Sequence, residues 1–184
     1  MALPAPAEIV AFWRDAGAAR WFAKDETFDA EIIRRFEPAH HAAARGEFDR
    51  WRETAEGALA LLILLDQFPR NIWRGSAHAF ATDPLALHHA RAALMAGHDL
   101  TTDAALRVFF YLPFEHSEAL ADQDLCLAKC EALDTESGSK WSNWARLHRD
   151  IIVRFGRFPH RNACLGRLST AEELAFLEQG GFSG

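Results

Sequence analysis

The stretch from Ala58 to Leu65 is apolar throughout, and it restricts the fold more than any other part of the chain. It is too short to cross a bilayer, because a membrane-spanning helix needs about 20 apolar residues. It continues a helical pattern that already contains Phe48 and Trp51. A helix that is apolar on every side is buried on every side. We therefore expect a helix over 47–67 at the centre of the hydrophobic core.

Helical signals dominate the rest of the chain as well, with apolar residues at intervals of three and four and with proline, glycine or capping residues at the ends. The further helices that we expect run from Pro6 to near Gly17, from about Thr27 to Gly46, from Asp83 to Gly97, from Asp103 to Tyr111, from Pro113 to about Leu133, and from Trp141 to Phe155, with a last helix opened by a capping box at Ser169 and Glu172. No stretch shows the alternation of a β-strand. The sequence therefore predicts an all-α fold of antiparallel helix pairs, in a single all-helical domain over 1–184.

Composition indicates which classes of partner and which cellular compartment to expect. A hydrophobic fraction of 49% fills the core of one domain, and a formal net charge of −6 disfavours nucleic acid and anionic membranes as partners. The amino terminus lacks the pattern of a signal peptide. Cys126, Cys130 and Cys164 do not form a disulfide framework, and the first two, one helical turn apart, fit buried positions. We expect a cytoplasmic protein.

Seventeen of the twenty basic residues are arginine. Arginine binds carboxylate and phosphate groups with two parallel hydrogen bonds, which lysine cannot do. A preference for arginine codons in a GC-rich genome explains the same bias without any function. Both explanations stay open at this point.

Asp66 directly follows the apolar run and begins the motif Asp66-Gln-Phe-Pro-Arg-Asn71. A buried carboxylate must be paired with a cation or lose its charge. Arg70 and Arg74 are close in sequence, and further arginines lie in a related segment, Gly156-Arg-Phe-Pro-His-Arg-Asn162. An ion pair of this kind either locks two helices together or forms part of a ligand site.

A second group of polar residues follows Pro113. Glu115, Glu118 and Asp122 have the spacing i, i+3 and i+7, which places three acids on one face of a helix. Three explanations remain open: a solvated acidic face, a network paired with arginines, or a metal site completed by a histidine.

The third group is Arg154-Phe-Gly-Arg-Phe-Pro-His-Arg-Asn162, in which glycine and proline interrupt the helix. So many donors in one loop suit a carboxylate or a phosphate, although they equally suit the free carbonyls of helix ends. One or two helical turns earlier, His148 lies on the apolar face of its helix, where it is either a hydrogen-bonded core residue or a catalyst.

These three groups lead to one functional hypothesis, a cleft that binds a small anionic molecule and supports acid–base catalysis. The candidate catalytic residues are Glu115, Glu118, His148 and His160, and the candidate ligand contacts are Asp66, Gln67, Arg70, Asn71, His116, Arg154, Arg157, Arg161 and Asn162. No cofactor and no bound metal are assigned, and the sequence defines no oligomeric state. The alternative is a protein- or peptide-binding module in which the motifs only hold helices together. Cys164 lies near His160, but nothing in the sequence marks it as a nucleophile.

Taken together, the motifs resemble a bacterial family of uncharacterised proteins, domain-of-unknown-function family 924. The segments that carry the resemblance are Leu64-Leu-Asp-Gln-Phe-Pro-Arg-Asn71, Phe110-Tyr-Leu-Pro-Phe-Glu-His-Ser-Glu118 and Arg154-Phe-Gly-Arg-Phe-Pro-His-Arg-Asn162. The resemblance extends over about residues 9 to 180. It implies a fold similar to the tetratricopeptide-like superfamily, a right-handed array or bundle, and no established activity. Ala119 and Leu168 stand where many members carry more polar residues.

Overall fold

The computed structural model describes residues 3–182, and within that range the chain forms helices and loops without any strand. The α-helices up to residue 107 are α1 (Pro6–Ala16), α2 (Ala18–Trp21), α3 (Glu26–Ala44), α4 (Ala55–Leu62), α5 (Phe68–Ile72), α6 (Asp83–Met95) and α7 (Ala104–Arg107). They are followed by α8 (Leu112–Glu115), α9 (Leu120–Ser137), α10 (Trp141–Phe155) and α11 (Ala171–Glu178). The prediction of an all-α fold is confirmed. No helix among the described residues is long and apolar enough to span a membrane.

The chain forms two compact units. Residues 3–74 and 78–113 make up the first unit, and residues 75–77 and 114–182 make up the second. The single domain over 1–184 and the tetratricopeptide-like arrangement both stay predictions.

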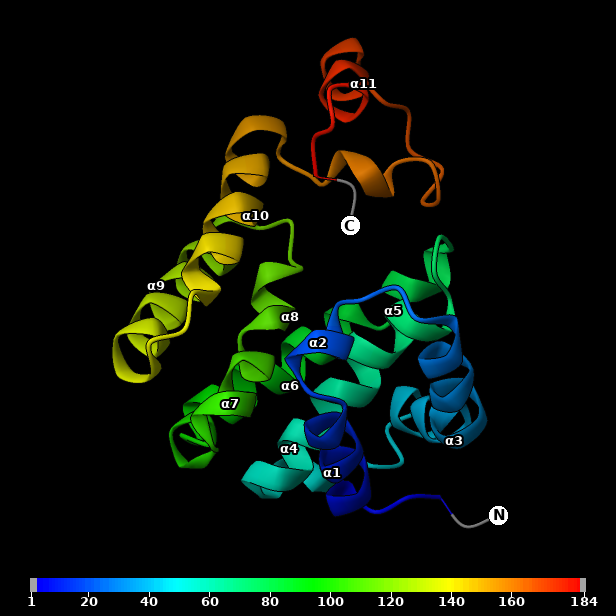
Figure 1. Cartoon of the computed structure of the whole chain (residues 1–184), viewed down its shortest axis with the longest axis vertical. Helices are drawn as coiled ribbons and strands as arrows, with labels where there is room; N and C mark the ends of the chain where they lie inside the picture. The colour runs from blue at the N-terminus through cyan, green and yellow to red at the C-terminus, as the bar shows by residue number, and fades with distance from the viewer. Residues whose placement is uncertain (1–2, 183–184) are drawn as a thin grey trace. The chain divides into compact units, whose positions relative to one another are not determined.

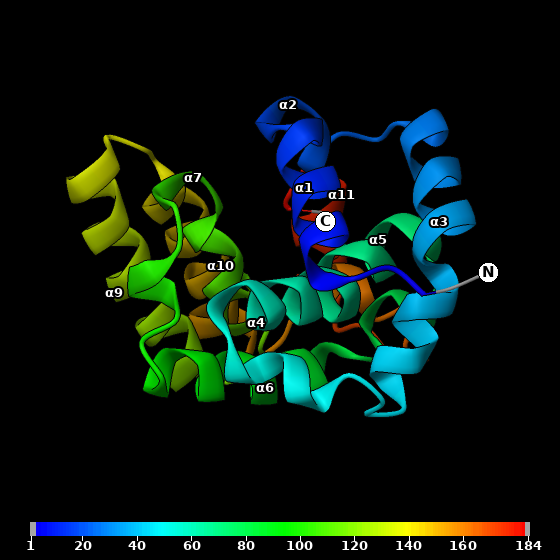
Figure 2. The ribbon, with the colours of Figure 1, turned by 90° about the horizontal axis from the view of Figure 1, so that it is seen from below.

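The core of the first unit lies around α4, which packs between α1 and α6 (Figure 2). Every residue from Ala58 to Leu65 is buried, so the predicted centre of the core is confirmed. The helix begins later than predicted, at Ala55, where the Thr54 side chain accepts a hydrogen bond from the Gly57 N–H. The preceding residues form a separate 3₁₀ turn, η1 (Asp49–Glu53), which packs against α4.

The end of the predicted helix over 47–67 also differs from expectation. After α4 the chain widens into a π-helical turn, η2 (Ile63–Gln67), and then continues directly into α5. Pro69 does not stop the helix, because it lies in the first turn of α5, where no backbone N–H is required.

The second unit is built on the antiparallel pair α9 and α10, which lie side by side in Figure 1. Cys126 and Cys130 are fully buried, as predicted. The helix α9 continues past Leu133 to Ser137. The helix α10 matches its predicted bounds and ends at Gly156, whose φ of 70° favours glycine.

The predicted continuous helix from Pro113 to Leu133 is wrong. The helix α8 ends at Glu115 and α9 begins only at Leu120, with a loop between them. The Gln123 side chain donates hydrogen bonds of 2.6 Å to the carbonyl oxygens of Glu115 and of Ser117, which a continuous helix would have paired internally. Glu115, Glu118 and Asp122 therefore do not share one helix face.

Two capping predictions are wrong by one residue. The N-cap of α6 is Thr82 rather than Asp83, whose carboxylate instead pairs with Arg70. The capping box of α11 consists of Thr170 and Glu173 rather than Ser169 and Glu172. The predicted helix from Asp103 to Tyr111 begins as α7, whose N-cap is Asp103, and it continues as the 3₁₀ turn η5 (Val108–Phe110).

Candidate functional site

The Asp66–Asn71 motif lies in the first unit, where its charged residues meet each other and Asp83. Asp66 is 1% exposed, and its Oδ1 lies 3.5 Å from a guanidinium nitrogen of Arg70. The same guanidinium donates to both carboxylate oxygens of Asp83, at 2.9 and 3.0 Å. Gln67 donates to Asp66 Oδ2 at 2.6 Å. The cation that pairs with buried Asp66 is therefore Arg70.

The last residue of this motif, Asn71, is held by a carboxylate that sequence reasoning missed. Asp29 of α3 accepts a hydrogen bond of 2.8 Å from the Asn71 amide and two from Arg74, at 2.6 and 3.0 Å. These contacts fasten α3 to the end of α5.

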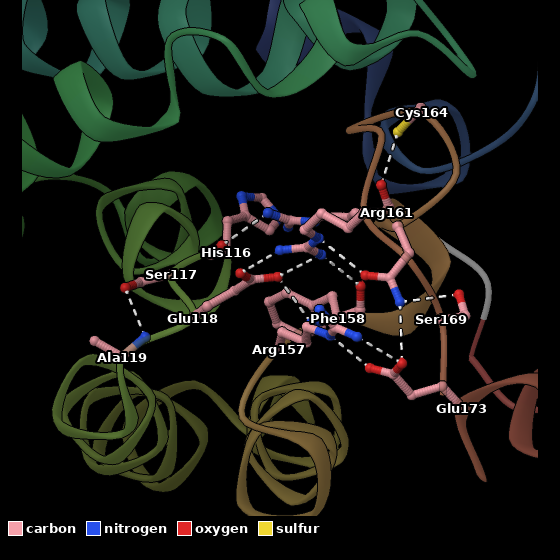
Figure 3. Close-up of polar contacts among 12 residues, drawn as sticks. His116, Ser117, Glu118, Ala119, Arg157, Phe158, Arg161, Cys164, Ser169 and Glu173 are labelled. Carbon is pink, nitrogen blue, oxygen red and sulfur yellow. Dashed lines mark hydrogen bonds and ion pairs between the residues drawn. The ribbon is translucent and has the colours of Figure 1, made fainter. Parts of the chain in front are cut away.

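The second unit gathers several of the other candidates around one buried ring, Phe158, which is 0% exposed. We call this group the Phe158 cluster, and its polar members are Glu115, His116, His148, His160 and Arg161. The ring centroids of His148 and His160 each lie 5.6 Å from that of Phe158. The Arg161 guanidinium carbon lies 4.5 Å from the same centroid, within cation–π range. Arg161 also donates to the backbone oxygen of His116 at 3.1 Å (Figure 3).

His148 and Glu115 are in contact, although they come from α10 and α8. His148 Nδ1 lies 2.9 Å from the carbonyl oxygen of Trp144 and 3.4 Å from Glu115 Oε1. Because a carbonyl oxygen can only accept, Nδ1 carries the ring proton and Nε2 carries the lone pair. The hydrogen bond to the Trp144 carbonyl oxygen thus fixes the tautomer of His148.

Burial lowers the pKa of His148 to about 3, and electrostatic interactions with His116, Arg161 and His160 act in the same direction. The imidazole is therefore neutral at physiological pH, and its contact with Glu115 is not an ion pair. The prediction that His148 points inward is confirmed, since the residue is 6% exposed.

Glu118 lies in the loop between α8 and α9 and holds the loop that follows α10. It accepts two hydrogen bonds from Arg167, at 2.7 and 3.0 Å, and one from the Phe158 N–H at 2.8 Å. Burial opposes the charge of Glu118, but these hydrogen bonds outweigh it and keep the pKa of the carboxyl below its ordinary value. Glu118 therefore positions Phe158, and Arg167 is a partner that sequence reasoning missed.

Glu173 of α11 holds the same loop from the other side. Arg157 donates to its two carboxylate oxygens at 2.6 and 2.8 Å (Figure 3), and the Asn162 amide donates at 3.3 Å. The hydrogen bond from Arg157 lowers the pKa of Glu173 to about 2. Glu173 was also missed, although Thr170 and Glu173 fit the capping-box spacing as well as Ser169 and Glu172 do.

Arg154 lies at the surface, where it pairs with Glu172 at 2.9 Å. An open depression of about 420 Å³ is found here, lined by Arg154, Phe155, Arg157, Thr170, Glu172 and Glu173. Both of its arginines are paired with its glutamates, so the depression offers no excess positive charge to an anion.

The remaining candidates from the sequence are Cys164 and a metal site. Cys164 donates its thiol proton to the carbonyl oxygen of Arg161 at 3.2 Å. Within residues 3–182, no group of three or more histidine, cysteine, aspartate or glutamate residues is arranged to hold a metal ion.

Comparisons with known proteins agree with this description. The family model described as "Bacterial protein of unknown function (DUF924)" matches residues 9–181. A solved structure of a protein of unknown function from Agrobacterium tumefaciens is 51% identical, with a TM-score of 0.89, over 95% of this chain and 97% of that chain. No curated protein matches the chain. The chain belongs to the DUF924 family.

Proposed function

We propose that the Phe158 cluster binds a small molecule with a carboxylate or phosphate group, and that His148 accepts a proton from it. The observation that carries the proposal is the fixed tautomer of His148. Nδ1 is held by the Trp144 carbonyl oxygen and lies beside Glu115, so the basic nitrogen is Nε2. A neutral imidazole whose Nδ1 proton is held by a hydrogen-bond acceptor, so that Nε2 is the basic nitrogen, is the arrangement of a general base.

The charges around His148 favour an anion at the same place. Arg161 is 6% exposed, and guanidinium groups bind carboxylates and phosphates with two oxygens at once. Burial is the main cause of the low pKa of His148, and the Arg161 guanidinium lowers it further. A bound anion offsets the charge of Arg161 and so raises that pKa, in the direction that proton transfer at physiological pH requires. Binding and catalysis are thereby linked.

The proposal leaves out several residues of the sequence hypothesis. The structural pairs of the first unit include Asp66, Gln67, Arg70 and Asn71. Arg157 and Asn162 hold the loop that follows α10 through Glu173. Arg154 pairs with Glu172 at the surface. Glu118 positions Phe158 through the backbone N–H rather than transferring protons.

The test is the melting temperature of the protein in rising concentrations of inorganic phosphate, malonate and succinate. A ligand of the native state raises the melting temperature with the logarithm of its concentration. Arg161→Lys keeps the positive charge but cannot bind two oxygens of the anion at once, so the rise in melting temperature should be smaller. Arg154→Ala is the matched control, because this exposed arginine lies outside the cluster, and it should keep the full shift. Wild type without any shift, or equal losses in both variants, would refute the proposal.

The second candidate is a helical protein- or peptide-binding module whose motifs hold helices together. Two observations favour it: Arg157 and Arg167 are fully engaged with Glu173 and Glu118, and Trp144 on α10 is 55% exposed. This candidate predicts that small anions leave the melting temperature unchanged. It also predicts that Trp144→Ala abolishes capture of a specific partner protein.

A further inference from the structure

Phe182 covers two of the imidazoles in the Phe158 cluster. Its ring centroid lies 4.6 Å from that of His148 and 5.2 Å from that of His160, with interplanar angles of 65° and 79°. Phe182 is itself only partly buried, and it packs against the apolar group that includes Ile151 and Ile152. Phe182 thus covers part of both imidazole rings.

Two glycines bring Phe182 back to the cluster from the end of α11. Gly180 has a φ of 80°, which other residues rarely adopt. The Gly181 N–H donates to the Phe176 carbonyl oxygen at 2.9 Å, and a Cβ at Gly181 would lie 2.5 Å from that oxygen. Both positions therefore require glycine, and glycine also gives the backbone the widest freedom to rotate. Consecutive glycines next to a partly exposed ring have the properties of a hinge.

We propose that Phe182 is a gate over the His148 imidazole, which swings outward on the Gly180–Gly181 hinge to admit a carboxylate or phosphate compound. The inference rests on the proposed function, since a gate has a purpose only if the cluster takes a ligand. In the closed position the ring keeps water away from His148 and strengthens the electrostatic interactions of the cluster. In the open position the His148 imidazole becomes accessible to the ligand.

Diethyl pyrocarbonate tests the gate without any ligand, because it carbethoxylates neutral imidazoles that it can reach. The rate at each histidine is followed by peptide mass mapping in wild type, Phe182→Ala and Phe155→Ala. Phe155 is the matched control: it belongs to the same apolar group, but its ring packs on Phe176, with centroids 5.1 Å apart. The exposed His41 serves as an internal standard.

We expect the rate at His148 to rise about tenfold in Phe182→Ala, because the population of open molecules sets the rate. The rate in Phe155→Ala should equal that of wild type. Equal rates in wild type and Phe182→Ala would overturn the gate, as would equal rises in both variants, which would indicate general loosening of the apolar group.

If Phe182→Ala loses the helical circular dichroism of wild type, Phe182→Leu takes its place. Leucine keeps an apolar side chain in the group but leaves part of His148 uncovered, so we expect a rise of about threefold. Absence of any rise contradicts the gate. Because the reagent needs no bound anion, this result is independent of the phosphate and malonate titrations, so the two proposals can fail separately.

Discussion

The two Phe-Pro motifs of this chain have related sequences and different backbones. Phe68-Pro69 lies on a continuous helical path, because η2 leads directly into α5. Phe158-Pro159 lies in a loop, because Gly156 ends α10 and Phe158 has an extended ψ of 108°. Among the differences between the two motifs, the residue two positions before the phenylalanine is Asp66 in one and Gly156 in the other. Gly156 has a φ of 70° and ends α10, whereas the chain remains helical at Asp66.

The difference in backbone changes what the polar side chains do. On the helix, Arg70 and Asn71 face carboxylates of other helices and form structural pairs. In the loop, His160 and Arg161 lie with His148 around a common ring, Phe158. The same kind of motif therefore fastens helices in the first unit and assembles a candidate site in the second.

The largest expected effect concerns the loop motif and acid stability. The pKa of His148 is 6.5 in the unfolded chain and about 3 in the native protein. Between these values the unfolded state binds more protons, so stability is lost as the pH falls from 6.5 toward 3. His148→Gln removes this loss, which amounts to about 3 kcal/mol at pH 4.

Urea denaturation at a series of pH values measures that effect. Exposed His41 provides the control, and His41→Gln should follow the wild-type profile. Parallel pH profiles for wild type and His148→Gln would show that His148 is not a buried neutral imidazole.

A smaller effect is expected for the helix motif. Asp29→Ala removes the acceptor of both Asn71 and Arg74 and should lower the free energy of unfolding by about 2 kcal/mol. Asp15 is an exposed carboxylate, and Asp15→Ala should change stability much less. Phosphate, malonate or succinate should raise the melting temperature of Asp29→Ala as much as that of wild type. Their loss would mean that the two motifs do not have separate roles.

The smallest effect concerns the backbone of the loop motif. Gly156→Ala should cost about 1 kcal/mol, because alanine is strained at positive φ. A Cβ at Gly156 meets no atom within 4 Å, so the cost contains no steric clash. Gly156→Asn should cost less, since asparagine tolerates this conformation. Equal denaturation midpoints for Gly156→Ala and wild type would show that the turn does not require glycine.

Much of the fold could be predicted because local signals agree with it. Gly156 and the apolar spacing along α10 give its bounds correctly, and the run from Ala58 to Leu65 marks the core. The break after Glu115 could not be predicted in this way. It depends on Gln123, whose side chain takes over carbonyls that helical spacing assigns to the backbone.

The candidate site was predicted as a set of residues but not as an arrangement. His148 was selected because it lies on an apolar face, and Glu115 because its spacing from Glu118 and Asp122 predicted a shared helix face. Their contact joins two helices, and no local pattern contains it. Phe182 was missed because its contacts with His148 and His160 join segments that are far apart in the sequence.

The most direct test of the proposed site is the pKa of the His148 imidazole, measured by NMR with and without malonate and phosphate. Without an anion, the account predicts a pKa far below the ordinary value, near the value of about 3 that burial produces. At saturating anion it predicts a higher pKa, because the bound charge offsets that of Arg161. A pKa near 6.5 in the free protein, or a value that neither anion changes, would contradict the account.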